Sequence, residues 1–155
     1  MSEEKKLGSS PRNLAKRKVM DLLSRRDHSE QELRIKLRDK FSEVEDSDNV
    51  IDEAIEFAKD SKWLGDPQEL SYRMADMLHR RNKGIIYINN YLREKGLPAV
   101  ETDRALELEK ALTIVKNKYD ENYEFSREEQ ARVGRLLASR GFDSETVRKV
   151  LYEKL

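Results

Sequence analysis

The chain has 155 residues, of which 37% are hydrophobic and 40% are charged, and its 31 basic residues balance 31 acidic ones. This apolar share is lean for a globule with one deep core, and it suits an elongated helical protein in which each helix buries one face. The absence of cysteine excludes a disulfide framework, a thiol nucleophile and a thiolate metal site.

The spacing of apolar residues predicts helices along most of the chain. Residues 1–9 are polar and aperiodic, and we expect a disordered tail there. No window alternates with the two-residue period of a strand, so the predicted class is all-α. In chain order the expected helices cover about residues 11–26, 29–41, 50–62, 67–81, 85–94, 98–119, 127–140 and 147–151.

Start and stop signals mark the ends of these helices. Ser29 is followed by Glu32 at the spacing of a capping box, and Ser126 is followed by Glu129 in the same way. Gly65 follows the third predicted helix, where a glycine can adopt the left-handed cap conformation. From 98 to 119 helical spacing continues without an obvious break, so one helix is expected to begin at the Leu97-Pro98 pair.

The chain repeats itself. A shift of 55 residues places 19–27 on 74–82 with apolar, acidic and basic positions coinciding, and a further shift of 45 places 95–97 on 140–142. Small helical units of this kind cannot bury their apolar faces alone, so they stack. We therefore predict three tandem three-helix repeats in an elongated, curved rod: a tail at 1–9 and repeats at 10–65, 66–108 and 109–155.

The formal net charge of zero hides charge blocks of opposite sign. Residues 1–18 carry a net +4, 43–69 a net −8, 72–95 a net +4 and 130–155 a net +3. Such a dipolar surface favours a protein partner, because a protein that coats DNA is normally basic overall.

No pattern of catalytic or metal-binding residues is present. The sequence has no glycine-rich phosphate loop, nucleophile elbow or metal-ligand cluster, so we predict no enzyme, no cofactor and no metal. His28 and His79 are the only histidines and lie on different repeats; His28 is expected to bond the local backbone at a helix corner. Without an apolar signal region or a membrane-length stretch, the protein is expected to be cytoplasmic, with no membrane contact.

Two arginine pairs sit at equivalent corners, Arg25-Arg26 and Arg80-Arg81. One interpretation is that they neutralise the negative ends of their helices. The other is a repeated basic ridge that meets acidic loops of a partner or DNA phosphates. Arg26 and Arg81 continue the apolar stripes, so one arginine of each pair could be structural.

The aromatic residues also have two interpretations. Trp63, at the end of the third predicted helix, is favoured as a buried wedge between repeats over a platform for stacking bases. Tyr72, Tyr87 and Tyr91 interleave with basic residues, which is typical of nucleic-acid binding but also fits a helical core.

Corner motifs follow one another along the chain: Arg26-Asp27-His28-Ser29 with Glu32-Leu33 and Leu37, then Trp63-Leu64-Gly65-Asp66, Lys83-Gly84, Leu92-Arg93-Glu94-Lys95-Gly96 and Arg140-Gly141-Phe142. In this order and spacing they resemble the RecX family, bacterial regulators of the RecA recombinase. The resemblance covers about residues 12–153. Two departures stand out: the segment 101–119 is shorter than the family's link, and Ile85-Ile86-Tyr87 replaces a small or proline-containing, basic stretch. The residues that carry the resemblance and are expected to be structural are Asp27, His28, Ser29, Glu32, Leu33, Leu37, Trp63, Leu64, Asp66, Gly84, Leu92, Gly96, Gly141 and Phe142.

The resemblance implies a non-catalytic modulator, mainly an inhibitor, of RecA in recombinational DNA repair and the SOS response. Such proteins lie in the groove of the RecA filament on single-stranded DNA, bridge protomers, and limit ATP hydrolysis, strand exchange and filament extension. We expect a monomer when free, with weak direct DNA binding. The alternative is a helical module that binds single-stranded DNA itself and competes for the lattice.

We predict partner contacts at basic residues of the repeated corners and helix ends. Gly84, Gly96 and Gly141 are expected to set the bends. Apolar residues that include Met77, Ile88, Val133 and Leu137 would hold the repeats together. The predicted partner-binding residues are Arg25, Arg26, Arg80, Arg81, Lys83, Arg93 and Arg140.

Overall fold

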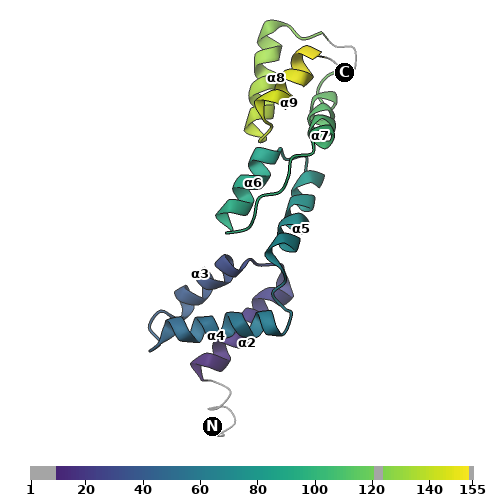
Figure 1. Cartoon of the computed structure of the whole chain (residues 1–155). Coiled ribbons are helices and arrows are strands. Elements are labelled where there is room, and N and C mark those ends of the chain that lie inside the picture. The colour runs from purple at the N-terminus through teal and green to yellow at the C-terminus, as the bar shows by residue number, and fades with distance from the viewer. Residues whose placement is uncertain (1–9, 121–123, 154–155) are drawn as a thin grey trace. The chain divides into compact units, whose positions relative to one another are not determined.

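The computed structural model describes residues 10–120 and 124–153, whose path is traced in Figure 1. Within these two ranges the chain forms eight α-helices and one π-helical turn, and no residue lies in a β-strand. The predicted all-α repeat class is confirmed; the predicted tail at 1–9 lies outside the described residues. The elements are α2 Pro11–Arg25, α3 Glu30–Phe41, α4 Ser47–Asp60, α5 Pro67–Arg80, α6 Ile85–Glu94, α7 Arg104–Lys116, α8 Arg127–Ser139, α9 Ser144–Arg148 and η1 Lys149–Glu153.

The described chain divides into two units, each with buried apolar residues of its own. The first unit comprises the described residues up to Leu70 together with Lys95–Leu97. The second comprises Ser71–Glu94 and the described residues from Pro98 onward. Helix α5 begins in the first unit and continues in the second.

In the first unit, α2, α3 and α4 bury the stripes that their sequences predict. Val19 of α2, Leu33 and Leu37 of α3 and Ile55 of α4 are completely buried in one cluster. Helices α2 and α4 lie side by side, as the purple and blue ribbons of Figure 1 show. Burying aliphatic side chains of this size contributes about 1.5–3 kcal/mol each, so this cluster stabilises the unit.

The predicted capping boxes are present at both sites. The Ser29 hydroxyl accepts a hydrogen bond of 3.1 Å from the Glu32 N–H, and the Glu32 carboxylate accepts one of 3.1 Å from the Ser29 N–H. Ser126 and Glu129 exchange the equivalent bonds at 3.2 Å. These bonds satisfy backbone donors that the first turn of a helix leaves open, which is why α3 and α8 begin where they do.

The end of α4 differs from the prediction. Lys62, with φ of 60°, takes the left-handed position, and Gly65 is not among the residues of positive φ. The Trp63 and Leu64 N–H groups then both donate to the Ala58 carbonyl, at 2.9 and 3.1 Å. This turn carries Leu64 into the core and leaves Trp63 46% exposed, so the prediction of a buried Trp63 wedge is wrong. Met77, predicted to hold repeats together, is likewise exposed.

The predicted helix over 98–119 begins later than expected. Helix α7 starts at Arg104, where the Asp103 carboxylate accepts from the Leu106 N–H at 3.1 Å. Upstream, the Asn89 side chain holds Val100 by two hydrogen bonds, at 2.9 Å to its N–H and 3.2 Å to its carbonyl, which keeps that stretch out of a helix. Consequently the predicted repeat boundary between 108 and 109 lies inside α7.

The second unit packs α7, α8, α9 and η1 around one apolar cluster. Ala111 and Leu137 are completely buried, and Val133, Phe142 and Leu151 are nearly so. Ile88 and Leu92 of α6 are also buried, as their spacing predicts. The turn between α5 and α6 carries Arg81 and Lys83, and the turn between α8 and α9 carries Arg140; all three are predicted binding residues.

Candidate partner-binding surface

The predicted partner-binding residues divide between the two units. Arg25 and Arg26 belong to the first unit, whereas the other five belong to the second. Some of these side chains form ion pairs or hydrogen bonds within their own unit, and others are exposed.

Arg26 is part of a local ion-pair network in the first unit. Its guanidinium donates to the Asp27 carbonyl at 2.8 Å and to the Glu32 carboxylate at 3.0 Å, and the Lys95 ammonium reaches the same Glu32 oxygen at 3.0 Å. Burial alone would raise the pKa of the Glu32 carboxyl, but the bonds from Ser29, Lys95 and Arg26 outweigh it and hold that pKa below its ordinary value. Arg26 therefore stabilises the α2–α3 corner.

Arg25 and His28 have simpler environments at the same corner. The Arg25 side chain is exposed and lies 3.3 Å from the Asp21 carboxylate one turn earlier, a surface pair of little energetic weight. His28 is buried, and its Nδ1 lies 3.0 Å from the Arg26 carbonyl, so the expected backbone contact is present. Burial is the main reason that the pKa of His28 is lowered.

In the second unit two turns lie backbone to backbone. The Gly84 N–H donates to the Arg140 carbonyl at 2.8 Å, and the Ile86 N–H donates to the Gly141 carbonyl at 2.9 Å. We call the turns 81–84 and 140–141, joined by these bonds, the paired corner. It brings Lys83 and Arg140 together, although they are 57 positions apart in the sequence.

A buried lysine lies beneath the paired corner. The Lys110 side chain is only 3% exposed, and its ammonium contacts the Lys83 carbonyl at 2.6 Å, His79 Nδ1 at 2.8 Å and a Glu107 carboxylate oxygen at 2.8 Å. Burial lowers the pKa of Lys110, and the Glu107 charge opposes that shift. Burial and the Lys110 charge lower the pKa of His79. Lys110 thus ties α7 to the turn that carries Lys83.

Sequence reasoning missed Lys110 and Glu107. The available signal was a Glu and a Lys three residues apart, on the same helical face as the apolar residues around Ala111. A buried ion pair needs such mutual placement, because an isolated charge in a core is strongly unfavourable.

The outer side of the paired corner is basic and partly apolar. The Arg80 side chain is 79% exposed beside Asp76 at 2.8 Å, and both Arg81 and Arg140 are exposed. Ile86 and Tyr87 are exposed next to them, and the Lys83 ammonium lies 4.8 Å from the centre of the Tyr87 ring. Exposed aromatic, aliphatic and arginine side chains in one place are typical of a recognition surface.

Arg93 lies away from this corner. It is near the end of α6, a helix of 10 residues that begins next to Gly84, and its guanidinium bonds the Asn90 side chain. At a rise of about 1.5 Å per residue, roughly 13 Å of helix separates the two ends. The structure therefore groups Arg80, Arg81, Lys83 and Arg140, and it does not group Arg93 with them.

The motif residues outside this surface have structural surroundings. A side chain at Gly96, where φ is 70°, would meet the Gln31 side chain, so this corner requires glycine. Asp66 is exposed, and its carbonyl accepts from the Leu70 N–H at 3.0 Å in the first turn of α5. The buried members of the motif set are His28, Ser29, Leu33, Leu37, Leu64, Gly84, Leu92, Gly141 and Phe142.

Two features are absent from the part of the chain that the structure describes. Over residues 10–120 and 124–153 no group of three or more histidine, aspartate or glutamate side chains is arranged to hold a metal ion. None of the helices in the same ranges has the length and apolar character needed to cross a bilayer.

Together these features define an all-α helical-repeat protein with an exposed basic surface, and comparisons with known proteins agree with the fold class. Sequence models of RecX match twice: the first three-helix domain over residues 15–57 and the third over residues 105–151. The regulatory protein RecX of Leptothrix cholodnii is 32% identical over 149 residues, covering 91% of this chain and 89% of its own. That of Pseudomonas syringae pv. tomato is 29% identical over 144 residues, covering 88% of each.

A solved structure has the same fold. The crystal structure of RecX from Lactobacillus salivarius superposes with a TM-score of 0.72 at 19% identity, over 93% of this chain and 96% of that one. The chain belongs to the RecX family of regulatory proteins.

Proposed function

We propose that this protein is a non-catalytic modulator, mainly an inhibitor, of the RecA recombinase. It binds in the groove of the RecA filament on single-stranded DNA and bridges neighbouring protomers. From there it limits ATP hydrolysis, strand exchange and filament extension, and so acts in recombinational DNA repair and the SOS response. The observation that carries this proposal is membership of the RecX family.

The paired corner is the surface that we assign to RecA. Arg80, Arg81, Lys83 and Arg140 supply positive charge, and the exposed Ile86 and Tyr87 supply apolar area that a purely phosphate-binding surface would not need. Complementary charge would speed encounter with acidic segments and fix register more than it adds affinity. Arg25 and Arg93 are assigned secondary contacts, and Arg26 a structural role.

Co-sedimentation tests the proposal. The protein is mixed with RecA filaments on single-stranded DNA, and separately with the DNA alone, and each mixture is pelleted over a series of salt concentrations. We expect binding to the filament to exceed binding to bare DNA and to fall only modestly with salt.

The competing function is direct occupation of the DNA lattice. The exposed Tyr72 and Tyr87 near arginines are the observation in its favour. If the protein binds the DNA lattice directly, it should pellet with bare DNA as much as with the RecA filament. Its affinity should also fall steeply as the salt concentration rises, because each phosphate contact releases counterions. That result would contradict the RecA proposal.

A further inference from the structure

A groove runs between α8 and η1 on the second unit, apart from the paired corner. Its volume is about 610 Å³. The α8 residues that line it begin at Arg127 and recur at intervals of three or four positions as far as Ala138. This spacing places them on one face of the helix. The lining residues are Arg127, Gln130, Ala131, Gly134, Arg135, Ala138, Leu151 and Tyr152.

Small residues make up the floor of the groove. Gly134 has no side chain, and a Cβ placed there would make ordinary van der Waals contacts with Leu151 at 3.5 Å and Val147 at 3.8 Å, so these two side chains border the floor at this point. Ala131 and Ala138 are exposed on the same face. Beside them Tyr152 is 65% exposed, the highest value among the exposed large hydrophobic residues of the described chain.

The charged side chains in the described lining of the groove have one sign. Among the lining residues that the structure describes, Arg127 and Arg135 are charged, and none is a carboxylate. Neither arginine joins an ion pair with another described residue. They are eight positions apart on α8, which corresponds to roughly 12 Å along the helix. Guanidinium groups bind carboxylates through two parallel hydrogen bonds, so the groove offers two such positions on either side of an apolar floor.

We propose that this groove receives an acidic peptide segment of the protein partner, with an apolar side chain seated between two carboxylates. The apolar side chain would pack on Ala131, Gly134 and Leu151, beside the Tyr152 ring. The carboxylates would pair with Arg127 and Arg135. This inference rests on the proposed function and names a second contact surface for it.

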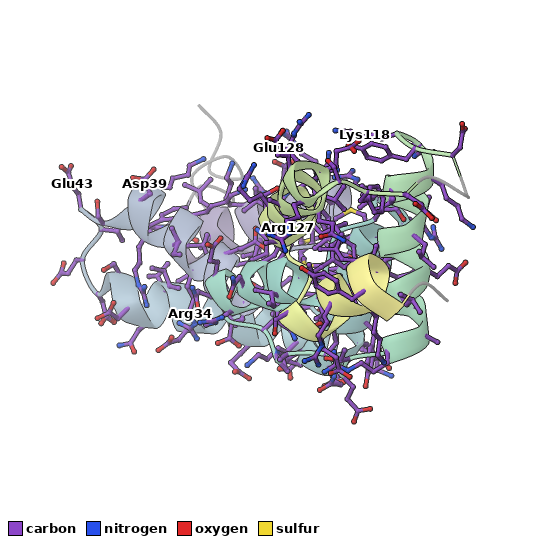
Figure 2. The ribbon with its side chains drawn as sticks, turned by 90° about the horizontal axis from the view of Figure 1, so that it is seen from above. Arg34, Asp39, Glu43, Lys118, Arg127 and Glu128 are labelled. Carbon is purple, nitrogen blue, oxygen red and sulfur yellow. The ribbon has the colours of Figure 1, made fainter. Side chains whose placement is uncertain are left out.

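A peptide fits these features better than a nucleic acid does. Glu128 and Glu129 directly follow Arg127 at the start of α8, where Figure 2 labels Arg127 and Glu128. A continuous polyanion would be repelled there, whereas a peptide can present carboxylates at two points only. The floor also contributes binding energy only to a ligand that buries apolar surface on it.

Site-specific photo-crosslinking tests the location. Ala131→p-benzoylphenylalanine places the probe on the groove floor. Arg132→p-benzoylphenylalanine, at an exposed residue of the same helix that does not line the groove, is the matched control. With RecA filaments on single-stranded DNA, we expect the probe at 131 to crosslink a protein segment rich in Asp or Glu and the probe at 132 to give background. Equal crosslinking at both sites, or crosslinking at 131 to the DNA, overturns the proposal.

Charge reversal tests the chemistry. Arg135→Glu is expected to weaken co-sedimentation with the filament by about tenfold, because attraction becomes repulsion at a rim charge. Arg132→Glu, the same change three residues away, is expected to stay within about twofold of the unsubstituted protein. If Arg135→Glu and Arg132→Glu weaken co-sedimentation equally, the groove proposal is overturned and the proposed function is left intact. If the unsubstituted protein does not pellet with filaments, the proposed function fails and the groove proposal with it.

Discussion

Gly84 and Gly141 lie backbone to backbone in the second unit. A Cβ placed on Gly84 would stand 2.2 Å from the Gly141 carbonyl carbon, and one placed on Gly141 would stand 2.4 Å from the Tyr87 Cβ. Gly141 also has φ of 91°. Two glycines thus allow the hydrogen bonds between the α5–α6 and α8–α9 turns, and these bonds hold Lys83 and Arg140 at one corner.

The substitution Gly84→Ala tests this relationship. The added methyl group meets backbone rather than a flexible side chain, so we expect the free energy of unfolding to fall by about 1–3 kcal/mol. Gly134→Ala is the matched control, because its Cβ would have ordinary contacts of 3.5 Å and helix propensity favours alanine by about 1 kcal/mol. Urea denaturation followed by circular dichroism measures both. Equal stability of Gly84→Ala and the unsubstituted protein would contradict the close approach.

The turn after α4 gives a second prediction, since it buries Leu64 and exposes Trp63. Leu64→Ala is expected to lower the free energy of unfolding by about 2–4 kcal/mol, because it leaves a cavity in the first core. Trp63→Ala is expected to change it by less than about 1 kcal/mol. Chemical denaturation compares the two variants, and a larger loss for Trp63→Ala would restore the wedge interpretation.

The two histidines predict how stability depends on pH. Both pKa values are lowered from 6.5 in the folded protein, chiefly by burial. One ring nitrogen of each histidine also faces a lysine ammonium: Lys36 lies 3.0 Å from His28 Nε2, and Lys110 lies 2.8 Å from His79 Nδ1. Below pH 6.5 the unfolded chain therefore binds more protons than the folded one. Stability is fully present above that pH and falls as the pH decreases toward the folded pKa values.

Urea midpoints between about pH 7.5 and about pH 5.5 measure this dependence, in a range above the titration of most carboxylates. The double variant His28→Gln with His79→Gln is the control, and its midpoint is expected to vary much less over the same range. If the urea midpoint of the double variant changes with pH as much as that of the unsubstituted protein, groups other than these histidines cause the pH dependence.

If the basic side of the paired corner binds RecA, reversing its charge should weaken inhibition and leave the protein folded. Arg80→Glu with Arg81→Glu should weaken inhibition of RecA, because both side chains are exposed on the assigned surface. Helicity and thermal midpoint should stay nearly unchanged, since the exposed Arg80–Asp76 pair contributes little. The matched control is Arg38→Glu with Lys40→Glu on exposed positions of α3. Inhibition equal to that of the unsubstituted protein would exclude these arginines from the surface.

Local features could be predicted from the sequence because they depend on nearby residues. The Ser29–Glu32 box needs only a hydroxyl and a carboxylate three residues apart, and the stripe of Leu33 and Leu37 needs only helical spacing. Trp63 was mispredicted because the direction of the chain after α4 depends on which residue takes the left-handed position, and Lys62 takes it in place of Gly65.

Long-range features could not be predicted in this way. The Gly84–Gly141 contact and the burial of Lys110 join segments far apart in the sequence, and a repeat alignment shows equivalent positions without showing which of them touch. Arg127 and Arg135 were likewise not selected, because their groove exists only once η1 packs against α8.

The ATPase activity of RecA on single-stranded DNA, titrated with this protein at two excesses of DNA, tests the central claim most directly. If the protein acts on the filament, inhibition occurs at substoichiometric protein and persists when free DNA is added. Inhibition that extra DNA relieves would contradict the account, because it would show competition for the DNA lattice.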